Sequence, residues 1–431
     1  MPQSEPSLVR DSRSRHESLL FGGLVLFALS LALSKSANNI LLGLVYLAVF
    51  YLMVRNRQFR QTVTNNIHQP LLVPLALYIG VALVGLLFTT NIADGLGIIG
   101  KMSGLALIYV MMSVLVSRVE DRGERMRQGE RLVLAFLAGV FILDIIGVLT
   151  YFGIVAHRKY FLPLSALNVY HIWFANLNAV AVYAALAVLL FSRDKKELRT
   201  QIFLFSFLPL GLASVLLSLS RTAWLGMVVT ALILAFLVIN NRKWLVLALL
   251  ALSAAGLSLY FFNPLIQSRI NQIAADIYLF GSGQARTNVG ERFLMWQSAF
   301  RMFLSNPFFG VGTGDYVATM NGYIASGQLP SFMAMFNQPH NIYLFALATN
   351  GLPGLAALLF IFFVSLRSSM RGIGEGNEER LFAFLALATI VHYMFAGLTE
   401  SMFNIQILRY TFAFIIGVCV RSPGKTGGGA A

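Results

Sequence analysis

The chain has 431 residues, of which 57% are hydrophobic and only 12% are charged, with a mean hydropathy of +0.73. A soluble globular domain carries about 25% charged residues, so the composition excludes one and predicts an all-α polytopic membrane protein. The net charge of +14 does not indicate nucleic acid, because the basic residues lie in short loops between apolar runs. The single cysteine, Cys419, excludes a disulfide framework and a cysteine metal site.

Twelve apolar runs are long enough to cross the hydrocarbon layer, which takes about 17 to 25 residues. The first run follows three arginines and resembles a signal peptide, but we interpret it as a span. The predicted spans are 18–34, 40–54, 71–89, 95–116, 131–152, 174–191, 202–219, 222–239, 244–262, 341–366, 380–398 and 404–420.

The distribution of Lys and Arg predicts the orientation. With the N-terminus in the cytoplasm, the cytoplasmic segments hold 22 of the 32 basic residues and the short outer loops hold four. Short cytoplasmic loops retain positive charge, so both termini are predicted inside and the long polar segment outside. The predicted parts are an N-terminal tail (1–17), nine spans (18–262), a periplasmic loop domain (263–340), three spans (341–420) and a C-terminal tail (421–431), which we expect to be disordered.

Five ionisable residues lie in or beside these spans, namely Lys101, Asp144, Arg221, His392 and Arg409. Such groups cost roughly 2.5–3.5 kcal/mol each at mid-depth, which makes them candidates for function. All five are predicted to lie nearer the outer face than the inner one. A secondary transporter is expected to place its polar site near the midplane, so the pattern favours a site at the outer interface. Arg221, in a tight turn among serines, favours function. The others have structural alternatives: Lys101 can snorkel, Asp144 and Arg409 can pair together or separately, and His392 can be a core residue.

The long loop contains one strongly predicted helix, over 288–305. Asn288 is the expected N-cap, and Glu291 follows it at the capping-box spacing. Arg292 projects with the apolar Met295, whereas Arg301 projects from the opposite, polar face. Arg292 therefore needs an anionic partner, either a lipid phosphate or an internal carboxylate.

Gly310, Gly312 and Gly314 form a Gly-x-Gly-x-Gly run. The run lacks the spacing and the strand–turn–helix context of a nucleotide-binding fingerprint, so we interpret its members as turn glycines. His340 stands where the loop enters the tenth predicted span. It is either a core or interface residue or a catalytic one, since a neutral imidazole there could accept a proton.

The chemistry available outside the membrane is limited. No His or carboxylate cluster has metal-ligand spacing, and a pair of catalytic carboxylates is not visible, although folding could assemble one. One histidine with several arginines suits a reaction in which a hydroxyl is deprotonated while a pyrophosphate departs. The outer carboxylates are Asp94, Asp276, Glu291, Asp315 and Glu400.

Four sequence blocks, in family order, resemble the O-antigen ligase and polymerase superfamily, and the twelve-span topology with one large outer loop resembles it along almost the whole chain. The blocks are SRTAWLG at 220–226, ER at 291–292 ahead of Trp296, NPFFGVG at 306–312, and HNIYL at 340–344 followed by GLPG at 351–354. Asn350 departs from the pattern, since many relatives carry an acidic residue there. The resemblance implies a metal-independent, cofactor-free, inverting glycosyltransferase of the C-type membrane class, in the inner membrane of a Gram-negative bacterium.

For the ligase branch, the resemblance implies transfer of a glycan from undecaprenyl pyrophosphate to a sugar hydroxyl of lipid A-core. His340 would be the general base or would orient the acceptor, and Arg221 and Arg292 would bind the pyrophosphate. Arg286 and Asn341 are weaker candidates, for a further phosphate contact and for helix-terminus positioning. A polymerase that joins lipid-linked repeat units remains an alternative, as does, from another class, a lipid-glycan flippase or transporter.

Overall fold

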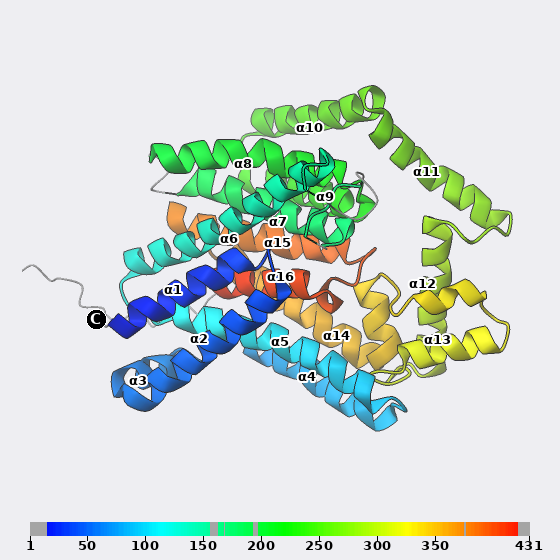
Figure 1. Cartoon of the computed structure of the whole chain (residues 1–431), viewed down its shortest axis with the longest axis horizontal. Helices are drawn as coiled ribbons and strands as arrows, with labels where there is room; N and C mark the ends of the chain where they lie inside the picture. Colours follow the sequence, from blue (N-terminus) through cyan, green and yellow to red (C-terminus); the bar gives the residue numbers. More distant parts are fainter. Residues whose placement is uncertain (1–14, 156–162, 168, 193–196, 375, 421–431) are drawn as a thin grey trace, which may run out of the picture.

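The computed structural model describes residues 15–155, 163–167, 169–192, 197–374 and 376–420. These residues form a bundle of helices with no named strand among them (Figure 1). The predicted C-terminal tail and almost all of the predicted N-terminal tail lie outside the described residues. The fold is therefore the expected helical, polytopic membrane protein.

A helix stands at each of the twelve predicted spans. In the described part of the chain, nine helices are long and apolar enough to cross a membrane, and three shorter apolar helices occupy the other expected positions. The twelve are α1 (Arg15–Ser30), α2 (Lys35–Arg55), α4 (Leu72–Gly85) with η1 (Leu86–Phe88), α5 (Ile92–Ser117), α6 (Arg122–Tyr151), α7 (His171–Phe191), α8 (Leu198–Leu217), α9 (Arg221–Val238), α10 (Arg242–Phe262), α14 (Ile342–Met370), α15 (Asn377–Ala396) and α16 (Gln406–Cys419).

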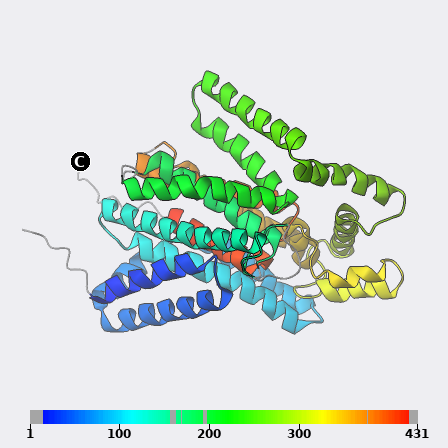
Figure 2. The same cartoon turned by 45° about the horizontal axis from the view of Figure 1, so that its top comes forward.

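Four further α-helices and two short 3₁₀ segments of the described residues connect the spans. The polar helix α3 (Arg57–Asn65) follows α2, and η4 (Met402–Asn404) precedes α16. The long loop holds α11 (Pro264–Gly281), α12 (Asn288–Ser305), α13 (Tyr316–Ala325) and η3 (Ser331–Met335). Helices α11 to α13 lie together at one end of the bundle, which we call the loop end (Figures 1 and 2).

Helix α12 has the predicted bounds, but its N-cap is Thr287 rather than Asn288. The Thr287 hydroxyl accepts a hydrogen bond of 3.1 Å from the Gly290 backbone N–H. Asn288 was the wrong choice because Asn and Thr are both good caps and stand next to each other in the sequence. The helix face is unaffected: Met295 and Ala299 are buried, whereas Arg301 is exposed as predicted.

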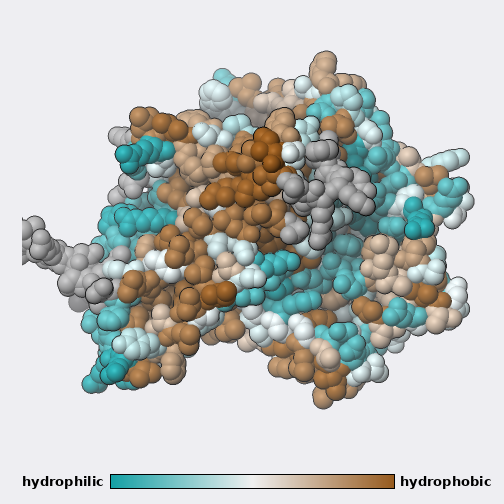
Figure 3. All heavy atoms as spheres, viewed as in Figure 1, coloured by the Kyte–Doolittle hydropathy of each residue, from teal (hydrophilic) through white to brown (hydrophobic). Residues whose placement is uncertain are grey.

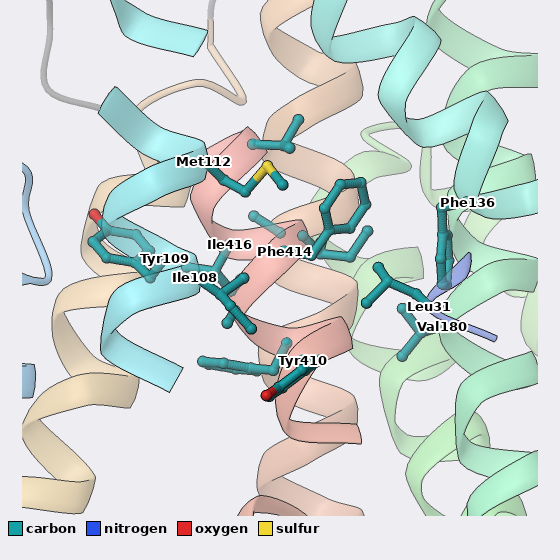
Figure 4. Close-up of a cluster of buried hydrophobic side chains, with 14 of the residues drawn as sticks. Leu31, Ile108, Tyr109, Met112, Phe136, Val180, Tyr410, Phe414 and Ile416 are labelled. Atoms are coloured by element: carbon teal, nitrogen blue, oxygen red, sulfur yellow. The ribbon is translucent and has the colours of Figure 1, made fainter. Parts of the chain in front are cut away.

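Helix α16 lies in the core of the bundle. Phe414 is fully buried and packs near Phe136 of α6, while Ile416 lies against Ile108 and Met112 of α5 (Figure 4). Helices α5, α7 and α15 pack around α16. Cys419, at the end of α16, is half-buried and forms no disulfide.

Helix α10, in contrast to α16, lies at the edge of the structure, apart from the main bundle (Figures 1 and 2). None of its residues is buried, and Trp244, Leu250, Phe261 and Phe262 are all exposed. Apolar surface also covers much of the visible face of the bundle between its two polar ends (Figure 3). Such a surface suits hydrocarbon, since large exposed apolar patches are rare on soluble monomers.

Residues 306–314 turn back from the loop domain into a break in α14. Gly351 has φ +63 and ψ −156, which interrupts the helix, and a Cβ there would meet the Phe308 carbonyl oxygen at 2.4 Å. Gly310, Gly312 and Gly314 all have positive φ, which confirms the interpretation of turn glycines. The segment is thus held between α14 and the link from α4 to α5.

The remaining ionisable residues of the spans form no ion pair with one another in the described part of the chain, although Lys101 is an electrostatic neighbour of Arg409. Lys101 is exposed. Asp144 and Arg409 are buried, but no ion pair joins them, and Arg409 instead donates to the Phe403 carbonyl at 2.7 Å. His392 is a core residue whose Nε2 lies 2.9 Å from the Asn176 amide oxygen.

Candidate functional site

His340 lies at the loop end, immediately before the N-cap of α14. Its backbone has φ +47, a left-handed conformation that costs a non-glycine residue roughly 1–2 kcal/mol. Hydrogen bonds on both sides stabilise it: Trp296 Nε1 donates to the Pro339 carbonyl at 3.1 Å, and Asn341 Nδ2 donates to the Leu398 carbonyl at 2.9 Å. The imidazole is 26% exposed, so a ligand can reach it.

Glu400 fixes the proton on the His340 ring. His340 Nδ1 lies 2.9 Å from Glu400 Oε1, and a carboxylate can only accept, so Nδ1 carries the hydrogen and Nε2 the lone pair. Glu400 is completely buried, and its Oε1 also accepts from the Ser401 backbone N–H at 2.9 Å. This arrangement resembles a base with its orienting carboxylate and leaves Nε2 free to take a proton.

Arg292 of α12 is an electrostatic neighbour of the same carboxylate. Burial lowers the pKa of the Arg292 guanidinium, the neighbouring Glu400 acts in the opposite direction, and Arg269 lowers the pKa further. No hydrogen bond or ion pair joins Arg292 to any other residue that the structure describes. A half-buried cation of this kind would be stabilised by an anion.

Arg221 is the first residue of α9 and forms a long ion pair with the buried Asp276 of α11. Its Nη2 lies 3.8 Å from Asp276 Oδ2, while its buried Nη1 has no hydrogen-bond partner within the described ranges. Arg269 holds α11 against this turn, since its Nε donates to the Leu219 carbonyl at 3.1 Å. Leu219 has φ +53, a second left-handed residue next to a predicted site residue.

Arg221, Arg269 and Arg292 are electrostatic neighbours, and we call them the arginine cluster. A hydrogen bond between two threonines connects this cluster to the His340–Glu400 pair. The hydroxyl of Thr399, the residue before Glu400, donates at 3.0 Å to the hydroxyl of Thr222, the residue after Arg221. The structure thus brings Arg221 and Arg292 together beside the partner of His340. Within the described residues only Arg221 of the three forms an ion pair, and that pair is long at 3.8 Å, so the cluster suits an anion with several oxygens.

The two weaker candidates, Arg286 and Asn341, lie near the site, but their contacts are with Phe332 and with the start of α14. Arg286 is exposed, with its guanidinium 5.7 Å from the centre of the Phe332 ring. Asn341 caps α14, and its Oδ1 accepts from the backbone N–H groups of Tyr343 at 3.0 Å and Leu344 at 2.9 Å. Asn341 thus acts locally on the helix terminus that follows His340.

A second carboxyl group adjoins the site. Burial raises the pKa of Glu291, while Arg286 and Arg292 act in the opposite direction, and His340 is among its electrostatic neighbours. In the part of the chain that the structure describes, no group of three His, Cys, Asp or Glu residues could hold a metal ion.

Sequence reasoning missed Arg269, His171 and the role of Glu400. Arg269 and Glu400 carry only a weak signal, namely a charge outside the predicted spans. His171 lies at the first residue of α7, and its electrostatic neighbours are Arg269, Arg292 and Glu400. A histidine beside an apolar run could have been examined as His340 was.

Comparison with known proteins supports the resemblance. Residues 204–359 match the family model described as O-antigen ligase, a segment that contains the arginine cluster and His340 but ends before Glu400. An uncharacterized protein of Haemophilus influenzae is 27% identical over 237 residues, which are 54% of this chain and 59% of the relative. The chain thus spans less than two thirds of that relative.

The family match confirms the predicted relation to the O-antigen ligase superfamily. Together with the apolar helices of the described residues, it indicates a multi-pass bacterial membrane protein. The family includes both ligase-type and polymerase-type functions.

Proposed function

We propose that the chain is an O-antigen ligase, which transfers a glycan from undecaprenyl pyrophosphate to a sugar hydroxyl of lipid A-core and so completes lipopolysaccharide. One observation carries the proposal: the His340–Glu400 pair lies beside the arginine cluster, in a segment that largely coincides with the family match. This arrangement offers a base for a hydroxyl and a cationic site for a diphosphate.

In the proposed reaction, His340 Nε2 takes the proton of the acceptor hydroxyl, and Glu400 stabilises the imidazolium that forms. The acceptor oxygen bonds to C1 of the donor sugar from the side opposite the pyrophosphate, so the configuration inverts. The bond between C1 and the phosphate oxygen breaks, and its electron pair leaves with the pyrophosphate. The arginine cluster neutralises the charge that gathers on this leaving group.

The proposed setting is the inner membrane of a Gram-negative bacterium, with both termini in the cytoplasm and the loop end in the periplasm. The concentration of Lys and Arg in the loops opposite the loop end supports this orientation. The lipid parts of the donor and acceptor would lie among membrane lipids, against the exposed apolar surface of the bundle (Figure 3).

A reconstituted assay tests the proposal. Purified protein in detergent is given a glycan on undecaprenyl pyrophosphate, a lipid A-core acceptor and no membrane gradient. We expect transfer to lipid A-core, with and without a chelator. Transfer only to a second lipid-linked glycan would establish a polymerase instead, no transfer would favour a transporter, and loss of activity with chelator would contradict the metal-independent reaction.

The same assay tests the base. We expect His340→Ala to abolish transfer and, in a producing strain, to leave lipid A-core uncapped while lipid-linked glycan accumulates. Normal capping in that strain would remove His340 from the mechanism. His16→Ala, at the other end of the bundle and exposed beside Tyr51, is the control.

A further inference from the structure

The start of α7 adds an unassigned imidazole to the site. His171 Nδ1 lies 2.8 Å from the Ser218 carbonyl oxygen. A carbonyl can only accept, so Nδ1 carries the hydrogen and Nε2 presents a lone pair. Nε2 has no hydrogen-bond partner among the described residues. His171 Nε2 is therefore a hydrogen-bond acceptor of fixed orientation that can bind a donor group of a ligand.

The position of His171 narrows down what that donor group can be. Its electrostatic neighbours are Arg269 and Arg292, which belong to the proposed diphosphate site, and Glu400, the partner of the proposed base His340. In an inverting transfer, C1 of the donor sugar must lie between the departing diphosphate and the attacking oxygen. A side chain that adjoins both the arginine cluster and Glu400 therefore faces the sugar bonded to the diphosphate.

The neighbouring aromatic residues suit a sugar as well. The ring of Tyr170 meets the His171 ring edge to face, with centroids 4.5 Å apart, and meets the Trp173 ring at 5.6 Å. Tyr170 is 51% exposed, so part of its surface remains open beside the imidazole. An open aromatic surface next to a hydrogen-bond acceptor matches the apolar faces and polar edges of a pyranose.

We propose that His171 binds the sugar directly attached to the diphosphate, with Nε2 accepting a hydrogen bond from a hydroxyl or amide N–H of that sugar. This inference rests on the proposed function, because it needs a glycan diphosphate in the site. It assigns His171 to substrate recognition, separate from the base His340 and from the arginine cluster.

The test compares two ligands, undecaprenyl pyrophosphate with one sugar and undecaprenyl pyrophosphate without it. We expect His171→Phe, which keeps an aromatic ring but no acceptor, to weaken binding of the sugar-bearing lipid about five- to tenfold, as one lost hydrogen bond would. Binding of the bare lipid should stay unchanged. His171→Gln, which can donate to Ser218 and accept at its oxygen, should restore most of the affinity.

Two controls give the comparison its meaning. Arg292→Gln should weaken both lipids, since it acts on the diphosphate, and His16→Phe should change neither. Equal weakening of both lipids by His171→Phe, or no weakening of either, would overturn the assignment. Because binding is measured without turnover, the result does not depend on the transfer assay that tests the ligase reaction.

Discussion

Glu400→Gln is the substitution that probes the proposed base most selectively. The side chain is fully buried, and its Oε1 accepts from His340 Nδ1 and the Ser401 N–H, each at 2.9 Å. Glutamine has nearly the same shape and an oxygen that can accept both bonds. The variant therefore keeps the orientation of His340 but removes the negative charge that would stabilise its protonated form.

The magnitude follows from the distance between the two groups. Unit charges about 4 Å apart interact by about 4 kcal/mol at the effective dielectric constant of about 20 that suits protein sites. If about half of the proton charge has reached the imidazole in the transition state, about 2 kcal/mol of stabilisation is lost. That corresponds to a fall of about 30-fold in kcat.

The assay is the rate of glycan transfer at saturating donor and acceptor, together with donor binding. We expect kcat to fall about 30-fold while donor binding changes little, and Glu197→Gln, an exposed acid at the start of α8, to match the wild type. A kcat within threefold of the wild type would refute the reasoning, because the carboxylate would then play no part in proton transfer.

Three further substitutions test the arginine cluster and the loop. Arg292→Lys keeps the charge but loses the planar fork, so transfer should fall about tenfold or more, whereas Arg301→Lys on the opposite face of α12 should not change it; equal activity would argue against a diphosphate contact. Gly351→Ala forces a side chain onto φ +63 and into the Phe308 backbone, so thermal stability should drop by at least about 2 kcal/mol, unlike Gly97→Ala in open space; an unchanged melting temperature would contradict the break in α14. Hydrogen bonds to Asp315 hold its pKa below the usual range although burial opposes them, so its stabilisation is present above about pH 4 and is lost as pH falls through the lower folded-state value. Asp315→Asn should therefore lower the melting temperature at pH 7, and this difference from the wild type should shrink as the pH falls below about 4. A difference that does not shrink would exclude the charge as its cause.

The membrane architecture could be predicted because hydropathy is a local signal. Each predicted span corresponds to a helix, since about 20 apolar residues suffice to identify one. The polar α3 was not predicted because its apolar face consists of only two buried residues, Phe59 and Val63. The cap of α12 was misplaced by one residue, since Thr287 and Asn288 offer the same chemistry.

The site itself could be predicted only in part. His340 and Arg292 carry local signals, namely the entry to a span and a cation on an apolar helix face. Glu400 is 60 residues from His340 in the chain, and Arg269 and His171 reach the site only because α11 and the start of α7 fold against the turn before α9. Such convergence depends on tertiary packing, which no periodicity records.

The most direct measurement of the central claim is a cryo-electron microscopy structure of the chain with undecaprenyl pyrophosphate bound in a lipid nanodisc. We expect the diphosphate oxygens within hydrogen-bond distance of the Arg221 and Arg292 guanidinium groups, on the side of the site that faces His340. A diphosphate held in a separate pocket, or at the end of the bundle opposite the loop domain, would contradict the proposed mechanism.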